Sequence, residues 1–299
     1  MKTITILSGK GGVGKSSISA SLAFSLAQES KIVAADCDVD AANLALLFGL
    51  KKLRKNERIS TNSKAFVNKN AKECKNIVKN CAFSAISWNK KKQLPEINEF
   101  LCEGCGVCKI LCPKGIEIRK VENAIIGEGQ TKYGFPIISG QLEMGESGSG
   151  KVVTVVKERA RQKAERQKAE YLIIDSAPGI GCPVIASVRG SDYILAVTEP
   201  TPTAFRALQR VLEVVEHFNI SYGIIINKSD LNRSFVKKIE EFAKNKNISI
   251  IAKIPFSKSF VEAMIKMKPI AEINPNYQKM FKSIISQIKL EIKNKKTIY

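Results

Sequence analysis

A glycine-rich loop near the start of the chain constrains the fold more than any other feature. The β-branched run KTITILS (2–8) leads into GKGGVGKSS (9–17), and a helical pattern follows to about residue 29. Residues 9–16 fit G-x-x-x-x-G-K-S, a pattern that binds phosphate when it joins a strand to a helix. The chain therefore opens with a predicted nucleoside triphosphate site at the end of a buried strand.

The residues of this loop each have a chemical reason to contact a triphosphate. Glycines let backbone N–H groups curl around phosphate oxygens, and the start of the following helix adds its dipole. Lys15 brings a positive charge to the β- and γ-phosphates, and Ser16 offers a hydroxyl to Mg²⁺. The predicted nucleotide-binding residues of the loop are Gly9, Lys10, Gly11, Gly12, Val13, Gly14, Lys15, Ser16 and Ser17.

Beyond the loop, short apolar runs alternate with segments of helical period. We expect further strands at 31–36, 170–179, 193–200, 222–230 and 247–256, and helices at 151–169, 202–218, 231–246 and 257–267. This alternation predicts an α/β fold with a mostly parallel sheet covered by helices on both faces, and the phosphate loop at 9–16 makes it a fold of the P-loop NTPase kind. The alternation stops between about residues 51 and 135. We therefore expect a discontinuous P-loop domain, 1–50 and 136–299, interrupted by an inserted domain at 51–135.

Cysteines gather inside the expected insert. Six of the eight lie between Cys74 and Cys112. The chain shows neither a signal peptide nor a run of about 18 apolar residues, so we expect a cytoplasmic protein. In a reducing compartment such clustering indicates a metal site rather than a disulfide framework. A single histidine, His217, argues against His-rich metal sites and His-based catalysis.

Two cysteine stretches define the expected metal site. The run CEGCGVCKILCP (102–113) has the C-x₂-C-x₂-C-x₃-C-P spacing of bacterial ferredoxins, which favours an iron–sulfur cluster over zinc. AKECKNIVKNCAFSAI (71–86) reads as the same run with two cysteines missing. In two-cluster ferredoxins the fourth cysteine of each run binds the other run's cluster. The predicted ligands of one [4Fe–4S] cluster are Cys81, Cys102, Cys105 and Cys108.

The remaining pair, Cys74 and Cys112, would then lie together at the vacated second-cluster site. They would be either two thiols or a disulfide. The alternative interpretation is that Cys74 and Cys81 are incidental. Replacement of Cys81 separates these two interpretations, because the cluster would be lost if Cys81 is a ligand and kept if Cys81 is incidental.

Lys10 gives the loop the form KGGVGKS, which resembles the deviant Walker A motif of the MinD/ParA/Mrp and nitrogenase-iron-protein superfamily. The resemblance implies an ATP-hydrolysing homodimer that sandwiches its nucleotides, with Lys10 reaching the partner's nucleotide. It also implies that Asp38 in DCDVD (36–40) positions the attacking water. The predicted catalytic residues are Lys10, Lys15 and Asp38. The alternative role for the acids of 36–40 is to cap a helix over AANLALLFG (41–49), and Asp40 fits it best.

Two further segments match the same superfamily. The resemblance implies that Asp175 in LIIDSAPG (172–179) contacts Mg²⁺ and that Gly179 senses the γ-phosphate. The predicted magnesium residues are Ser16, Asp36 and Asp175. In NKSD (227–230), Asn227 would read adenine, although Asn-Lys-x-Asp is also the guanine-reading pattern of GTPases. The rest of the site favours ATP.

Over nearly its full length the chain resembles MinD-superfamily P-loop ATPases that contain an inserted ferredoxin domain. The resemblance implies that ATP binding controls electron transfer from the cluster to an unknown redox partner. One alternative is an Mrp-like carrier that delivers the cluster to an apo-protein. The other is a MinD/ParA-like positioning ATPase whose insert senses redox state or staples the fold. For Cys182, in GIGCP (179–183), a buried structural thiol is favoured over a bridging cluster.

Charge and the C-terminal segment bear on partners. The net charge is +20, and residues 51–92 hold 13 Lys and Arg against two Glu with few aromatics. This composition predicts a solvated basic face suited to an acidic protein, and it disfavours nucleic acid. The segment 278–296 places five apolar residues on one helical face: Phe281, Ile284, Ile285, Ile288 and Ile292. We expect this helix to cover the sheet, and membrane binding is the alternative.

Overall fold

The computed structural model describes residues 1–294, so the last two residues of the helix expected at 278–296 lie outside the described part. The chain divides into two compact units. Unit 1 comprises Met1–Asn56, Ile126–Gln141 and the chain from Ser149 onward, and unit 2 comprises Glu57–Ile125 and Leu142–Gly148. The insert expected at 51–135 overlaps unit 2, but it includes short stretches of unit 1 and omits Leu142–Gly148.

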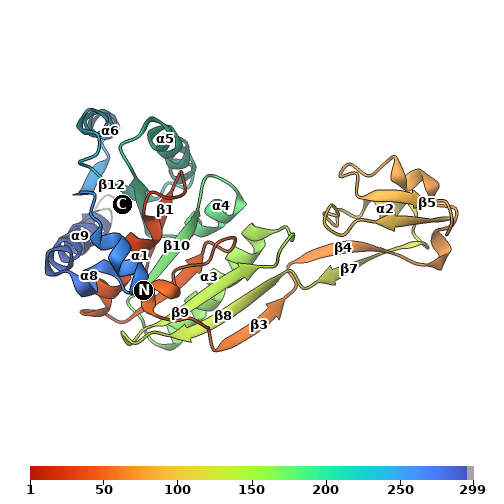
Figure 1. Ribbon diagram of the computed structural model, residues 1–299, viewed down its shortest axis with the longest axis horizontal. Coiled ribbons are helices and arrows are strands. Elements are labelled where there is room, and N and C mark those ends of the chain that lie inside the picture. Colours follow the sequence, from red (N-terminus) through yellow and green to blue (C-terminus); the bar gives the residue numbers. More distant parts are fainter. Residues whose placement is uncertain (295–299) are drawn as a thin grey trace. The chain divides into compact units, whose positions relative to one another are not determined.

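A single large sheet forms the centre of unit 1 (Figure 1). Within the described residues its strand order is β13-β12-β11-β1-β10-β2-β9-β8-β3. All neighbours from β13 to β9 run parallel, which confirms the predicted α/β fold. The strands are β1 (Lys2–Ser8), β2 (Ile32–Cys37), β3 (Lys55–Ile59), β8 (Ala124–Gln130), β9 (Pro136–Leu142), β10 (Tyr171–Pro178), β11 (Tyr193–Thr198), β12 (Ser221–Asn227) and β13 (Ser249–Ile254).

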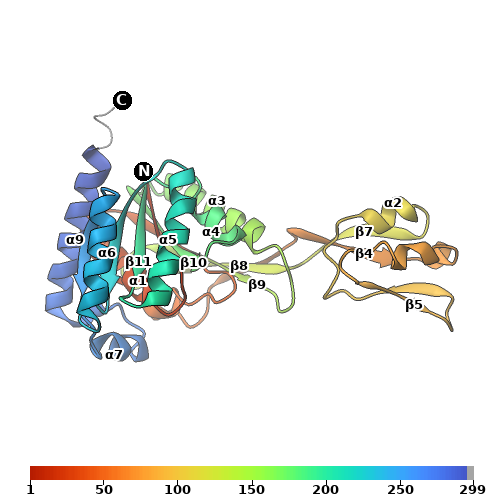
Figure 2. The ribbon, with the colours of Figure 1, turned by 90° about the horizontal axis from the view of Figure 1, so that it is seen from above.

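Helices cover both faces of this sheet because successive strand residues point to opposite sides. Ile6 of β1 packs with α1, α8 and α9, whereas the next residue, Leu7, packs with α4, α5 and α6. Figures 1 and 2 show α5 and α6 side by side. The helices of unit 1 are α1 (Lys15–Ala27), α3 (Ser149–Arg166), α4 (Cys182–Val188), α5 (Pro202–His217), α6 (Arg233–Asn245), α7 (Ser259–Ile265), α8 (Ile270–Ile273) and α9 (Pro275–Asn294), with the 3₁₀ turn η1 (Leu46–Phe48).

Local signals set several helix starts. Thr201 accepts a hydrogen bond from the Ala204 N–H at the start of α5, and Asn232 does the same for Phe235 in α6. The helix that Asp40 was expected to cap is absent from the described chain. Residues 41–49 contain only the short turn η1, so helix capping by Asp40 is wrong.

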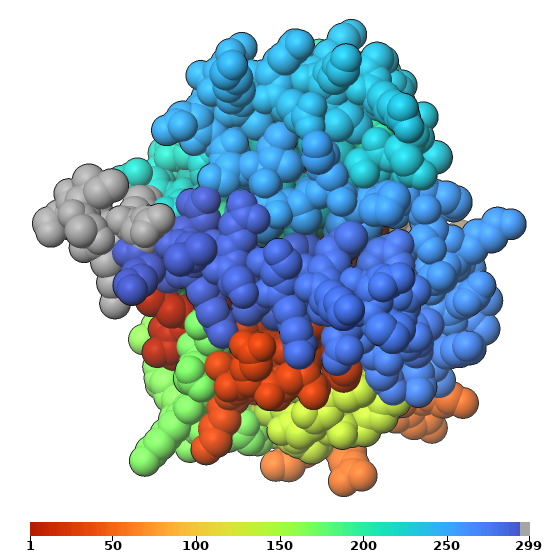
Figure 3. Space-filling view, turned by 90° about the vertical axis from the view of Figure 1, so that its left-hand side faces the viewer, coloured from red at the N-terminus to blue at the C-terminus, as the bar shows by residue number. Residues whose placement is uncertain are grey.

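The C-terminal helix α9 lies across one face of unit 1, below α6 in Figure 3. Four of the five apolar residues predicted to share a face are buried in the core, namely Phe281, Ile284, Ile285 and Ile288, and Ile292 packs partly buried against it. The expectation that this helix covers the sheet is therefore confirmed. In the described part of the chain, no helix combines the length and apolar character needed to span a membrane.

Unit 2 is built from two small antiparallel pairs and short helical turns. β4 (Asn62–Val67) pairs with β7 (Ile116–Val121), and β5 (Ile86–Asn89) pairs with β6 (Leu94–Ile97). The helical elements are η2 (Lys69–Ala71), η3 (Lys75–Val78) and α2 (Val107–Leu111). Its small core contains Ile77, Cys112 and Ile116, and four more cysteines pack partly buried against this core, Cys74, Cys81, Cys102 and Cys108.

Candidate nucleotide site and cysteine cavity

The glycine-rich loop lies between β1 and α1, at the carboxyl end of the parallel strands. Gly12 and Gly14 have φ values of +81° and +93°, which L side chains rarely adopt. A Cβ at Gly14 would also overlap the Asn227 side chain. The Asn227 Nδ2 donates to the Val13 carbonyl oxygen at 2.8 Å. This hydrogen bond fixes the loop to the end of β12.

Lys15 is the buried centre of the site, with 6% of its surface exposed. Its Nζ lies 2.8 Å from Asp175 Oδ1, 3.8 Å from Asp38 Oδ2 and 3.3 Å from Ser16 Oγ. Burial alone would lower the Lys15 pKa, but the charge and hydrogen bond of Asp175 outweigh burial and raise it. Lys15 is therefore held as a cation where phosphate oxygens would lie.

Asp175 has one satisfied and one unsatisfied oxygen. Its Oδ1 accepts from Lys15 Nζ and, at 2.7 Å, from Ser19 Oγ. Its Oδ2 is buried and has no hydrogen-bond partner among the described residues. A buried carboxylate oxygen without a partner is costly unless a ligand completes it, and hard oxygen donors suit Mg²⁺. Asp175 with the nearby Ser16 hydroxyl therefore fits the predicted magnesium ion.

Asp36 lies near the end of β2 and Asp38 directly follows that strand, and the charge of Asp175 acts on both carboxyl groups. Asp36 is fully buried, and burial, followed by the negative charge of Asp175, raises its pKa to about 7. Its two oxygens accept the N–H groups of Asp38 at 3.2 Å and Leu44 at 2.9 Å. Burial also raises the pKa of Asp38, which keeps one side open to solvent. Asp36 thus shapes the segment that carries Asp38.

One further charged residue at the site was missed by the sequence analysis. Glu199, which follows β11, is 8% exposed and binds two lysines. Its Oε1 lies 3.2 Å from Lys10 Nζ, and its Oε2 lies 2.7 Å from Lys228 Nζ. Lys228 also donates to the Gly12 carbonyl oxygen at 3.1 Å. Glu199 stands next to a strand end, as the predicted acids do, but its two partners come from distant segments.

The structure also describes the positions that were expected to read the base and to sense the γ-phosphate. Asp230, the acid that would pair with guanine in a GTPase, accepts the Phe256 N–H at 2.6 Å. Gly179, at the end of β10, has φ +100° and donates its N–H to the Ser8 carbonyl oxygen at 2.9 Å. Cys182, at the start of α4, is exposed rather than buried, so the expected buried structural thiol is wrong. A lone helix-start cysteine carries no pattern that reports its burial.

Helix α4 is fixed to α3 by one lysine. Lys157 Nζ donates to the carbonyl oxygens of Ala186, Ser187 and Arg189 at 2.9, 2.7 and 2.6 Å. At the other end of α4, Gly150 approaches Cys182 so closely that a Cβ on the glycine would lie 2.9 Å from that of the cysteine. No motif predicts either contact, because each joins segments about 30 residues apart.

In unit 2 the four predicted cluster ligands line one small cavity: Cys81, Cys102, Cys105 and Cys108. Two of the sulfurs accept backbone N–H groups, Cys102 from Ala65 at 3.4 Å and Cys81 from Ala85 at 3.3 Å. Among the described residues, however, no group of three or more His, Cys, Asp or Glu side chains is arranged to hold a metal ion. The iron–sulfur cluster therefore stays a prediction.

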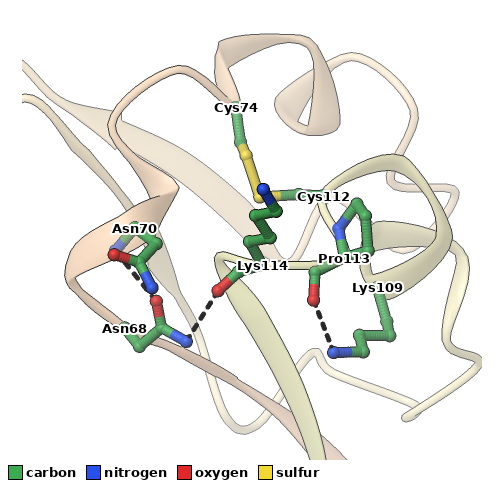
Figure 4. The surroundings of a disulfide bond; sticks show 7 residues. All are labelled: Asn68, Asn70, Cys74, Lys109, Cys112, Pro113 and Lys114. Atoms are coloured by element: carbon green, nitrogen blue, oxygen red, sulfur yellow. Dashed lines mark hydrogen bonds between the residues drawn. A yellow bond between two sulfur atoms is a disulfide. The ribbon is translucent and has the colours of Figure 1, made fainter.

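Cys74 and Cys112 form a disulfide (Figure 4). Of the two forms that the sequence left open, thiols or a disulfide, the structure has the second. The bond joins residues 38 positions apart, and all four cysteines of the cavity lie in the loop that it closes. The remaining cysteines of unit 2, all of which lie in the described part of the chain, form no disulfide.

Known proteins resemble this chain over most of its length. The family model for the CobQ/CobB/MinD/ParA nucleotide binding domain matches residues 4–270. An uncharacterised protein of Methanocaldococcus jannaschii is 41% identical over 230 residues, which are 77% of this chain and 79% of that protein. The septum site-determining protein MinD of Helicobacter pylori is 24% identical over an alignment of 303 residues, with 95% of this chain and 89% of that protein covered.

Solved structures that share the fold include MinD and McdA proteins. MinD of Pyrococcus horikoshii, complexed with Mg-ADP, has a TM-score of 0.59 at 17% identity and covers 97% of this chain and 96% of its own. McdA of Cyanothece has a TM-score of 0.60 at 18% identity, with 96% and 99% covered. With its phosphate loop, parallel sheet and matched family model, the chain belongs to the CobQ/CobB/MinD/ParA family of nucleotide-binding proteins.

Proposed function

We propose that this protein is an ATP-dependent switch that hydrolyses ATP in a homodimer, as a MinD/ParA-like ATPase. The observation that carries the proposal is the group of Lys15, Asp175 and Asp38, in which Lys15 and Asp175 are buried and one Asp175 oxygen has no partner among the described residues. The group lies beside a loop whose glycine conformations suit phosphate binding.

Each residue of the group would contribute one part of phosphoryl transfer. Lys15 would neutralise charge that develops on the β- and γ-phosphates. Ser16 and Asp175 would hold Mg²⁺, which supplies further charge neutralisation at the phosphate oxygens. Asp38, whose raised pKa suits a residue that accepts a proton, would orient the attacking water. Asp36 would keep the segment of Asp38 in place through its two backbone hydrogen bonds.

In the homodimer, Lys10 of each chain would contact the nucleotide bound to the other chain. Its side chain is 43% exposed and is held by Glu199 in the single chain. Exchange of Glu199 for the triphosphate of the partner's nucleotide would replace one ion pair by contacts with a more highly charged group. Asn227 would read adenine, and Gly179 would report the γ-phosphate to α4.

The test compares two neighbouring acids. Asp38→Ala should retain ATP binding and ATP-dependent dimerisation, measured by analytical ultracentrifugation, while single-turnover hydrolysis falls about 100-fold or more. Asp40→Ala is the matched control, since Asp40 is exposed in the same segment and should leave the rate unchanged. Equal losses in the two variants, or full activity in Asp38→Ala, would refute the assigned role.

A second candidate function rests on the cysteine cavity. We propose that the ferredoxin-like unit 2 holds one [4Fe–4S] cluster on Cys81, Cys102, Cys105 and Cys108, because these four thiols line one cavity. Soft thiolates suit iron, and N–H groups aimed at two of the sulfurs would stabilise their charge. Such a cluster would carry single electrons under control of the nucleotide state. A labile cluster would instead indicate delivery to an apo-protein.

Iron analysis of the protein and of its cysteine variants tests this second proposal. Protein purified without oxygen should contain about four irons per chain and give one S = 1/2 signal after reduction with dithionite. Cys81→Ala should lose the iron, and Cys112→Ser should keep it, because Cys112 pairs with Cys74. Zinc, absence of metal, or the reverse pattern in the two variants would remove the proposal and leave the ATPase intact.

A further inference from the structure

The two halves of the Cys74–Cys112 disulfide differ in accessibility. Cys112 is 2% exposed and belongs to the core of unit 2. Cys74 only packs against this core and is half-buried. The Cys74 side of the bond is therefore the more accessible of the two. In thiol–disulfide exchange, an accessible attacking sulfur paired with a shielded one is the functional arrangement.

The chain is shaped to enclose the buried half. A Cβ placed on Gly115 would lie 2.5 Å from Cys112 Sγ and 2.6 Å from Ala71 Cα, so only glycine leaves room for the sulfur. Gly115 also accepts the Asn68 N–H at 2.9 Å and donates to the Cys112 carbonyl oxygen at 3.2 Å. These contacts hold the Gly115 backbone close against the Cys112 sulfur.

The accessible half lies in a basic stretch of chain. Lys72 and Lys75 flank Cys74 in sequence, Lys114 follows Cys112 by two residues (Figure 4), and Glu73 is the one acid among them. Among the described residues no carboxylate forms an ion pair with any of these three lysines. Lys75 lies over the Trp88 ring at 5.9 Å. Neighbouring cations favour a thiolate over a thiol, which is the form that attacks a disulfide.

We propose that Cys74 and Cys112 form a dithiol–disulfide centre that reduces disulfides of another molecule, with Cys74 as the attacking thiol and Cys112 as the resolving thiol. This activity goes beyond the ATPase and the cluster, and it requires neither ATP nor iron. The substrate class is a disulfide that can reach a half-buried sulfur, either on a protein surface or in a small molecule.

The chemistry balances in two steps. The Cys74 thiolate attacks one sulfur of the substrate disulfide, which forms a mixed disulfide and releases the other substrate sulfur as a thiolate that takes a proton. The thiol of Cys112 loses its proton and attacks Cys74 Sγ, which restores the protein disulfide and releases the second substrate thiol. Two electrons pass from the protein to the substrate. A dithiol reductant returns them by the same exchange in reverse.

A trapping experiment tests the order of the two cysteines. Reduced Cys112→Ser and Cys74→Ser proteins are incubated with glutathione disulfide, and the modified sites are located by peptide mass mapping. Cys74 in Cys112→Ser should become glutathionylated about tenfold faster than Cys182, an exposed cysteine outside unit 2. Cys112 in Cys74→Ser should stay unmodified. Equal rates at Cys74 and Cys182 would refute the proposal.

The unmodified chain provides the second measurement. Reduced protein should convert glutathione disulfide to two glutathione molecules while the Cys74–Cys112 bond forms again. Dithiothreitol should reduce this bond without loss of the circular dichroism spectrum. If the bond opens only in denaturant, it is structural and the proposal fails. ATP hydrolysis is followed in the same samples, so that failure of this proposal is distinct from failure of the ATPase.

Discussion

At the scale of single residues, the ion pairs at the nucleotide site determine which groups bind Lys10 when no nucleotide is present. Glu199 holds Lys10 and Lys228 together, and these side chains come from three separate segments. Burial alone would raise the pKa of Glu199, but its bonds to Lys228 and Lys10 outweigh burial and lower it. Glu199 is therefore a carboxylate that competes with any other anion for Lys10.

Removal of this carboxylate charge tests the competition. In Glu199→Gln, Lys10 is released, and the ATP-dependent dimer should form about two- to fivefold more tightly, since a partly exposed ion pair is worth up to about 1 kcal/mol. Sedimentation velocity at a series of protein concentrations with ATP measures the change. Glu216→Gln is a control, because Glu216 pairs with Lys246 at a distant, exposed position. A weaker dimer would show that Glu199 positions Lys10 for the partner.

At the scale of elements, α3 and α4 act as a pair. Lys157 of α3 satisfies three carbonyl oxygens at the end of α4, where a helix otherwise leaves its last acceptors unpaired. The start of α4 follows Gly179, the residue expected to sense the γ-phosphate. Any displacement of α4 by nucleotide therefore acts on α3 through this lysine.

Replacement of that lysine should loosen α4. Lys157→Met keeps the length of the side chain but removes three hydrogen bonds, and we expect a loss of about 1–3 kcal/mol in the free energy of unfolding. Lys151→Met on the same helix is the control, because Lys151 is exposed. Urea unfolding measures both variants. A Lys157→Met protein as stable as the control would mean that water replaces the ammonium group.

At the scale of the whole molecule, two compact units share one chain, and each has its own core. The disulfide closes a 38-residue separation within unit 2 alone. Closure of a loop of this size stabilises a fold by about 3–4 kcal/mol in the chain-entropy account. The two units should therefore respond differently to reductant and to nucleotide.

Calorimetry can separate these responses. After removal of metal, dithiothreitol should lower the melting temperature of one transition, and Mg²⁺ with ATP should raise the other, because a ligand stabilises only the unit that binds it. Cys74→Ser/Cys112→Ser should melt like the reduced protein and lose its response to dithiothreitol. A single transition that shifts with both additions would show that the units unfold together.

The sequence by itself predicted six parallel strands of unit 1 and most of its longer helices to within a few residues, but it missed α4, α8, β8 and β9. Helices such as 202–218 and strands such as 193–200 were expected close to α5 (Pro202–His217) and β11 (Tyr193–Thr198). These predictions succeed because hydrophobic period, caps and the phosphate-loop glycines are local properties of the chain. The same holds for α9, whose apolar face was visible as a period and is buried as expected.

Only the tertiary structure decided the features that depend on distant segments meeting. β8 and β9 join the sheet beyond β2, the Glu199 carboxylate meets Lys10 and Lys228, and Cys182 is exposed. The sequence placed Cys74 and Cys112 together but left their bond open. Whether two sulfurs bond, or an acid meets a given lysine, depends on approach within a few ångströms across the fold. Sequence period does not encode that distance, and packing does.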